Sequence, residues 1–88
     1  MLEQHLDSFM EYVRVEKGLS ANTQEAYSHD LVQWFQYLNN SKDSLELSVI
    51  YYVGFMHDSG LSPVSVSRKL TSLRMFYKFL VSEGVIDS

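Results

Sequence analysis

Residues 62–84 read SPVSVSRKLTSLRMFYKFLVSEG, the stretch whose helix boundaries are clearest in the sequence. Ser62 is a suitable N-cap, and Pro63 stands at the first helical position. Proline is tolerated there because an N–H at this position would have no hydrogen-bond partner within the helix. Gly84 supplies a C-terminal stop. These signals predict a helix from Pro63 to about Ser82.

The predicted helix has two faces that differ in their side chains. The expected core face carries apolar and aromatic residues: Val66, Leu70, Leu73, Tyr77 and Leu80. The second face is polar in its N-terminal half, with Ser65, Arg68, Lys69 and Ser72, and then carries Phe76 and Phe79. Arginine and lysine are rarely buried, whereas phenylalanine usually is. We therefore expect the polar half to project into solvent and the phenylalanine half to lie under other helices.

Positive charge is concentrated in this segment of an otherwise acidic chain. The whole sequence has 7 Lys and Arg against 11 Asp and Glu, a net charge of −4. Residues 62–82 contain four cations and no acid, whereas residues 1–61 contain three cations and nine acids. A cationic segment set apart in this way suits a phosphate-bearing partner. The acidic total counts against it, because dedicated DNA-binding domains are usually basic.

Helical periodicity extends over the rest of the chain. An apolar stripe from Leu2 to Val13 predicts a first helix that Gly18 ends. A second helix begins at Ser20, or at Asn22 with Glu25 as a capping box, and runs to Leu38.

A third helix is predicted to begin near Asp43 or Ser44 and to stop at Gly60. Its expected core residues are Val49, Ile50, Val53 and Met56. The β-branched run around Tyr51 would also suit a strand, although the helical neighbours favour a helix. The expected fold is therefore all-α, a small bundle of helices with short connections.

Composition limits the classes of function. Eighty-eight residues make one small domain, and the absence of cysteine excludes disulfides and thiolate metal sites. We find no signal peptide and no apolar run long enough to span a bilayer, so we expect a cytoplasmic protein with no membrane partner. The three histidines form no metal-binding pattern, and no nucleophile motif or glycine-rich phosphate loop is present. We therefore expect no cofactor, no metal and no catalytic residue in this chain.

The starts of the second and fourth helices are the best candidate binding site. Free N–H groups of a first helical turn, together with hydroxyl and amide side chains, can hold a phosphate. Arg68 can reach a phosphate or a base edge. The same residues could instead only cap helices or form a solvated face. Pairing of Arg68 and Lys69 with carboxylates, or cover of this helix start by the rest of the domain, would overturn the proposed surface.

Two segments of the sequence resemble a known family. Residues 18–35 read GLSANTQEAYSHDLVQWF, and the second segment begins with SPVSVSRKL at residue 62 and runs through LRMFYKFL to EGVI at residue 86. In order and spacing they are similar to the N-terminal core-binding domain of tyrosine recombinases, the Xer, integron and phage-integrase group. The resemblance covers nearly the whole chain.

This resemblance implies a SAM-like bundle of four or five helices that binds double-stranded DNA at a recombination half-site through the helices equivalent to the second and fourth here. It carries to the following DNA-binding candidates: Ser20, Asn22, Thr23 and Tyr27, then Ser65, Arg68, Lys69 and Ser72. Ser28 and His29 stand where members of the family often have basic residues, which should weaken binding.

The resemblance also implies a division of the chain. Residues 1–84 would form the core-binding domain, and residues 85–88 would begin a linker to a catalytic domain that is absent from this sequence. The chain alone would then not be an enzyme. An alternative function is a protein-interaction module that contacts other recombinase protomers through an acidic surface with exposed Tyr51, Tyr52 and Phe55.

Overall fold

A computed structural model describes residues 2–87 of the chain, so Met1 and Ser88, the outermost residues of the expected domain and linker, lie outside the described part. The described residues form a short 3₁₀ helix, η1 (Leu2–His5), and four α-helices: α1 (Leu6–Val15), α2 (Ala21–Asn39), α3 (Leu45–Asp58) and α4 (Pro63–Ser82). The all-α expectation is confirmed, and the strand alternative around Tyr51 is wrong. Within residues 2–87, no helix combines the length and apolar character needed to cross a bilayer.

Serine side chains begin three of the helices. The hydroxyl of Ser20 accepts the N–H of Thr23 at 3.2 Å, that of Ser44 accepts the N–H of Leu47 at 3.4 Å, and that of Ser62 accepts the N–H of Ser65 at 3.2 Å. Each cap satisfies one of the free N–H groups of a first turn. Ser20 rather than Asn22 is therefore the N-cap of α2, because Asn22 already lies inside the helix.

Glycine ends α3 and α4 in the left-handed conformation. Gly60 has a φ of 84° and Gly84 a φ of 74°, values that side chains with a Cβ rarely adopt. After α3, the N–H of Gly60 bonds to the carbonyl of His57 and the N–H of Leu61 to that of Met56. This pair of bonds closes a Schellman motif, which lets the chain turn sharply into α4.

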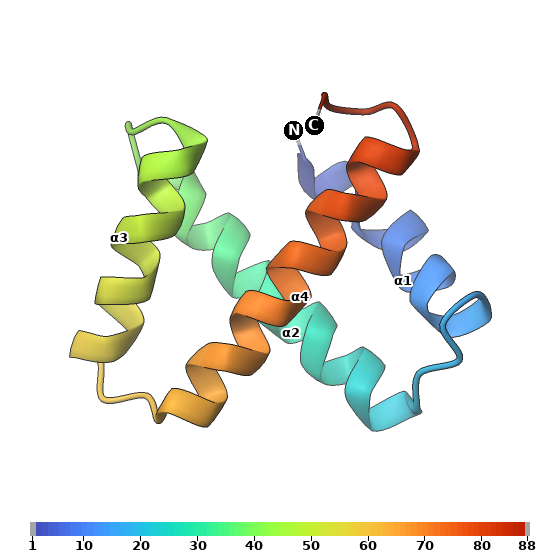
Figure 1. The fold of residues 1–88 in the computed structure, drawn as a ribbon, viewed down its shortest axis with the longest axis horizontal. Helices are drawn as coiled ribbons and strands as arrows, with labels where there is room; N and C mark the ends of the chain where they lie inside the picture. Colours follow the sequence, from blue (N-terminus) through green and yellow to red (C-terminus); the bar gives the residue numbers. More distant parts are fainter. Residues whose placement is uncertain (1, 88) are drawn as a thin grey trace.

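The two longest helices, α2 and α4, cross as an X, with α4 in front and α2 behind (Figure 1). Helix α1 lies on one side of the crossing and α3 on the other, while the two ends of the chain lie close together. The N-terminal ends of α2 and α4 both point to the lower edge of the molecule in this view. That edge is where the candidate binding residues would meet a partner.

Phe76 stands at the centre of the core, where it joins three helices. Its ring makes edge-to-face contacts with Phe9 of α1, at a centroid distance of 5.4 Å, and with Phe35 of α2, at 5.5 Å. Such pairs add about 0.5–1.5 kcal/mol beyond area burial. Phe76 and Phe79 are 0% and 7% exposed, which confirms that this end of the second face of α4 lies under other helices.

A second aromatic group joins α2 to α3 and α4. The Trp34 indole donates to the Tyr77 hydroxyl at 3.0 Å, and its ring lies 5.0 Å from that of Tyr52. Tyr52 and Met56 are buried, but Ile50 is 62% exposed, so its assignment to the core is wrong. Ile50 lies on the opposite side of α3 from Tyr52 and Met56, because helical neighbours two residues apart point in different directions.

Candidate nucleic-acid interface

Asp30 of α2 is the residue around which the candidate site is built. Its side chain is fully buried and receives hydrogen bonds from two consecutive cations of α4. Arg68 contacts both carboxylate oxygens, with Nε 3.1 Å from Oδ2 and Nη2 2.8 Å from Oδ1. Lys69 Nζ lies 2.9 Å from Oδ1. These hydrogen bonds compensate the Asp30 carboxylate, whose burial without partners would cost a large amount of folding free energy.

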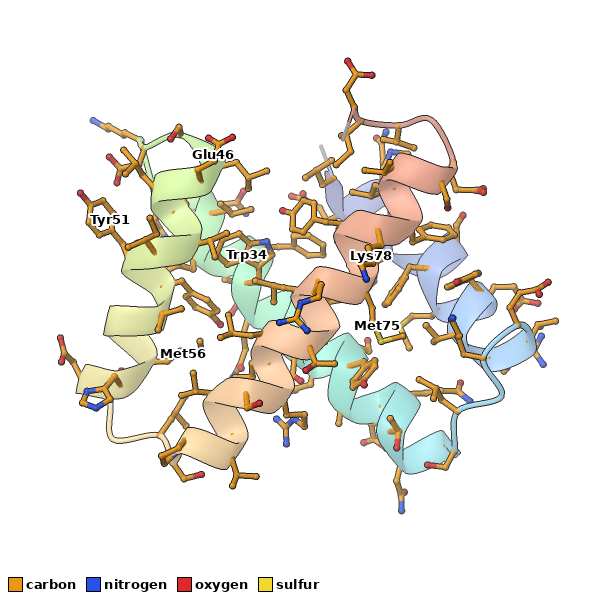
Figure 2. All side chains as sticks on the ribbon, viewed as in Figure 1. Trp34, Glu46, Tyr51, Met56, Met75 and Lys78 are labelled. Carbon is orange, nitrogen blue, oxygen red and sulfur yellow. The ribbon has the colours of Figure 1, made fainter. Side chains whose placement is uncertain are left out.

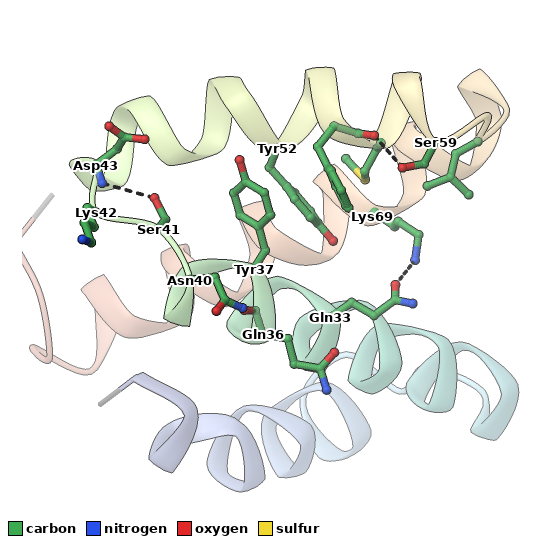
Figure 3. A pocket seen from close by; sticks show the side chains of 13 residues that line it. Gln33, Gln36, Tyr37, Asn40, Ser41, Lys42, Asp43, Tyr52, Ser59 and Lys69 are labelled. Carbon is green, nitrogen blue, oxygen red and sulfur yellow. Dashed lines mark hydrogen bonds between the residues drawn. The ribbon is translucent and has the colours of Figure 1, made fainter.

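Lys69 does not project into solvent, and that expectation is wrong. Its side chain is only 8% exposed, and besides Asp30 its ammonium donates to Gln33 Oε1 at 2.6 Å. Figure 3 shows Lys69 reaching Gln33 in a hollow of about 720 Å³ that Tyr37 and Tyr52 also line. The lysine is buried because its countercharge, Asp30, is buried; a long stem can carry its ammonium to such a partner.

Ser72 is likewise not exposed, contrary to expectation. It is 0% exposed, and its hydroxyl donates to the carbonyl of Lys69 at 2.8 Å. A serine whose hydroxyl bonds to its own helix can be buried without an unsatisfied donor. Of the four polar residues on this face of α4, only Ser65 and Arg68 retain appreciable contact with solvent.

Asp30, Arg68, Lys69 and Gln33 form the Asp30 cluster, and Arg68 is its half-exposed cation. Its side chain is 46% exposed although two of its nitrogens bond to Asp30. The hydrogen bond to Asp30 is the largest cause of the raised pKa of Arg68, against desolvation, with smaller contributions from the charges of Asp30 and Tyr27. Both cations are paired with a carboxylate, so the surface expected from the sequence, with Arg68 and Lys69 both unpaired, is wrong. Arg68, Lys69 and Asp30 together carry a net charge of +1, so one unit of positive charge remains.

A shallow groove connects Arg68 to the beginning of α2. It has a volume of about 330 Å³ and is lined by Asn22, Glu25, Ala26, His29 and Arg68. Asn22 and His29 are exposed, and their amide and imidazole groups can bond to an oxygen-rich ligand. Glu25 is the one carboxylate of the groove and opposes an anion placed close to it.

The other candidates occupy the same edge of the domain. Ser20 is exposed, while Thr23, Tyr27 and Ser65 are half-buried. The hydroxyl of Ser20 donates to that of Thr23, and the hydroxyl of Ser62 donates to that of Ser65. Capping therefore accounts for these hydroxyls locally, and the helix dipole gives each of these N-terminal ends a partial positive charge.

The three aromatic residues of the alternative interaction surface differ in exposure. Tyr51 and Phe55 are 52% and 55% exposed, but Tyr52 is 3% exposed and belongs to the core. The expected exposure of Tyr52 is wrong, because Tyr52 follows Ser48 by four positions on the side of α3 that is packed inward.

Sequence reasoning missed the roles of Asp30 and Gln33. A signal for Asp30 was present: it lies three residues after Tyr27 and four before Trp34, on the apolar stripe of α2. An acid on a core stripe indicates a buried partner of opposite charge. Gln33 gave no comparable signal, since only the path of the Lys69 side chain brings it into the cluster.

The described residues thus form a helical domain in which two crossing helices point their N-terminal ends to one edge, and one half-exposed arginine lines a groove beside the first half of α2. Residues 6–84 match the family described as "Phage integrase, N-terminal SAM-like domain". The chain belongs to this family.

Named relatives agree with the family assignment. The chain is 39% identical over 85 residues to tyrosine recombinase XerD of Listeria innocua, covering 90% of this chain and 29% of that protein. It is 33% identical to XerD of Oceanobacillus iheyensis, covering 100% and 32%, and 32% identical to XerC of Chlorobaculum tepidum, covering 93% and 28%. The chain therefore spans about a third of the length of these relatives. No solved structure shows a significant match to it.

Proposed function

We propose that this chain is the DNA-binding N-terminal domain of a site-specific tyrosine recombinase, and that it contacts a recombination half-site through the N-terminal ends of α2 and α4. The observation that carries this proposal is the position of Arg68. It is half-exposed in a groove that the first half of α2 also lines, and Asp30 fixes its guanidinium by two hydrogen bonds.

The candidate DNA-binding residues fall into an exposed or half-buried group and a buried group. Ser20, Asn22, Thr23 and Tyr27 of the α2 start would lie along the DNA backbone with Ser65 and Arg68 of α4. First-turn N–H groups and the helix dipole favour a phosphate at such positions. Lys69 and Ser72 are buried, so their role is structural support: Lys69 shares the charge of Asp30 and leaves part of the Arg68 guanidinium available.

The charge distribution favours DNA binding only in part. Residues 62–82 carry four cations and no acid. However, the charge of Lys69 is paired with buried Asp30, and the carboxylate of Glu25 lines the groove. We therefore expect weak, salt-sensitive binding by this chain alone. In the parent recombinase, catalysis and tight binding would come from the remaining part of the protein, and this chain would position that part on its site.

Fluorescence anisotropy with a labelled DNA duplex at low salt tests the proposal. Arg68→Ala should weaken binding and reduce the slope of log affinity against log salt by about one unit, because one phosphate contact is lost. Arg14→Ala is the matched control, since Arg14 is also an exposed arginine paired with one carboxylate, but on α1. Circular dichroism establishes that both variants are folded. Equal effects of the two substitutions, or no binding by the unaltered chain at low salt, would refute the proposal.

A further inference from the structure

The hollow that Lys69 shares with Tyr37 and Tyr52, which we call the Lys69 hollow, has the size of a small-molecule site. Its volume is about 720 Å³, and ligand pockets in proteins usually measure about 300–1,000 Å³. Side chains of α2 and α3 form most of its lining, and Lys69 of α4 completes it. The lining combines aromatic rings, amide side chains and an ammonium group. Apolar walls with a few polar groups are typical of ligand pockets.

The Tyr52 hydroxyl lies in this hollow without a hydrogen-bond partner among residues 2–87. Tyr52 is only 3% exposed. No side-chain oxygen or nitrogen in this part of the chain is both fully buried and unpartnered, so the hydroxyl is open to the hollow. Figure 3 shows the Tyr52 side chain extending from α3 toward α2, with its hydroxyl on the side of Gln33 and Lys69. Because a buried tyrosine usually bonds through its hydroxyl, this position indicates a ligand.

Two further donors that line the hollow are also unused within the described residues. An ammonium has three N–H bonds, and Lys69 directs two of them to Asp30 Oδ1 and Gln33 Oε1, which leaves the third. Because lysine can only donate, the Gln33 oxygen faces it, and the Gln33 NH₂ group remains to donate elsewhere. The end of the hollow at Lys69 therefore offers several donors, which suit an acceptor group such as a carboxylate.

The charge at this end of the hollow also favours an anion. The Asp30 cluster has a net charge of +1, because two cations share one carboxylate. Of the residues that line the hollow, only Asp43 is acidic. Figure 3 shows Asp43 and Lys42 at the other end of the hollow from Lys69. A carboxylate bound at Lys69 would therefore balance the charge of the cluster without a carboxylate of the lining close to it.

Three aromatic rings form an apolar wall of the hollow. The ring centroid of Tyr37 lies 4.8 Å from that of Tyr52 and 5.4 Å from that of Phe55, and the planes of the Tyr52 and Phe55 rings are 16° apart. Met56 also lines the hollow, and Figure 2 shows it on the inner side of α3, whereas Tyr51 points away from the other helices. Aromatic rings and a thioether favour a flat aromatic ligand.

We propose that the Lys69 hollow binds a small aromatic carboxylate. The carboxylate accepts hydrogen bonds from Lys69, Gln33 and Tyr52, while the aromatic ring of the ligand lies against the apolar wall. The hollow shares no lining residue with the groove of Arg68 that is proposed to contact DNA. Binding of the carboxylate is therefore an additional property of this chain, and it does not depend on the proposed function.

NMR titration of the ¹⁵N-labelled chain with sodium 2-naphthoate, without DNA, tests the proposal. We expect saturable shift changes at residues of the hollow, Gln33, Tyr52 and Lys69 among them, with a Kd on the order of 1 mM, as is usual for a ligand of this size. Naphthalene-2-carboxamide has nearly the same shape but no charge, and it should bind at least about fivefold more weakly. No saturable change at these residues up to about 10 mM 2-naphthoate, or equal affinity for the carboxamide, would overturn the proposal.

Tyr52→Phe separates ligand binding from folding. It removes a hydroxyl that has no partner within residues 2–87, so the urea midpoint should change little, whereas the affinity for 2-naphthoate should fall about tenfold with the loss of one hydrogen bond to the carboxylate. Tyr51→Phe is the matched control, since Tyr51 does not line the hollow.

Phe55→Ala tests the aromatic wall. It should also weaken the binding of 2-naphthoate, whereas Ile50→Ala should not, because Ile50 lies outside the hollow on the same helix. Phe55 and Ile50 are 55% and 62% exposed, so neither substitution opens the core. If Tyr52→Phe leaves the affinity unchanged, or if Tyr51→Phe lowers it as much, the carboxylate does not bind at this end of the hollow, and the proposal is wrong.

Discussion

Arg68 and Asp30, which lie 38 residues apart in the chain, join α4 to α2 by two hydrogen bonds to the two oxygens of one carboxylate. Asp30 is fully buried, whereas Arg68 is nearly half-exposed. One contact therefore belongs both to the interior of the helix crossing and to the candidate DNA surface. This link makes the orientation of the arginine dependent on the packing of α2 against α4.

The first prediction concerns Asp30. Asp30→Asn should destabilise the fold by about 3–5 kcal/mol, because it leaves the buried ammonium of Lys69 without a countercharge. Urea unfolding followed by circular dichroism measures this difference. Asp58→Asn is the control, since the Asp58 side chain is 88% exposed and its loss should change stability by less than about 0.5 kcal/mol. Similar values for the two variants would show that the buried cluster does not stabilise the crossing.

The second prediction concerns the hydrogen bond between Trp34 and Tyr77. Tyr77→Phe removes the hydroxyl that accepts the indole N–H and leaves that buried donor without its partner. The expected cost is about 1–3 kcal/mol. Thermal or urea unfolding measures it, with the exposed Tyr51→Phe as the control. A loss no greater than that of Tyr51→Phe would contradict the expected role of this bond.

The third prediction concerns alkaline pH. Burial, with a smaller contribution from the charge of Asp30, raises the pKa of Tyr52; burial also raises the pKa of Tyr77, although its hydrogen bond with Trp34 acts in the opposite direction. The folded chain therefore keeps protons that the unfolded chain releases. The resulting stability is fully present below the ordinary tyrosine pKa of 10.0 and is lost as the pH rises above it.

Unfolding in urea at a series of pH values from about 8 to 11 tests this dependence. Tyr77→Phe should reduce the slope of unfolding free energy against pH above pH ~10, whatever its effect on stability at neutral pH. Tyr51→Phe should leave the slope unchanged. A slope that neither substitution alters would mean that other groups control the alkaline transition.

The fourth prediction concerns Gly54. Gly54→Ala should stabilise the isolated chain by about 0.5–1 kcal/mol, because alanine favours a helix interior and the added Cβ meets open space. Urea unfolding of the two proteins measures the change. A loss of stability would show that an unseen constraint inside the domain requires glycine.

The helix boundaries could be predicted from the sequence because they depend on local chemistry. Ser20, Ser44 and Ser62 cap helices through their own first turns, and Gly60 and Gly84 adopt the left-handed conformation that ends them. The burial of Phe76 followed in the same way from its position on the helix. The caps and the glycine turns do not depend on what a distant residue does.

The Asp30 cluster could not be predicted in this way. Rotation around α4 placed Lys69 beside Arg68 on one polar face, but the burial of Lys69 depends on Asp30, 39 residues earlier. The error at Ile50 has another cause. Helix α3 is apolar on both sides, so its sequence periodicity does not indicate which side faces the core.

Mapping the DNA contact by NMR tests the central claim most directly. A ¹⁵N-labelled chain is titrated with a DNA duplex at low salt, and amide shift changes are assigned along the sequence. The predicted result is that changes concentrate at the starts of α2 and α4, in residues 20–27 and 62–68, with the guanidinium signal of Arg68 among them. Changes confined to α1, to α3 or to the outward side of α4 near Lys78 would contradict the claim.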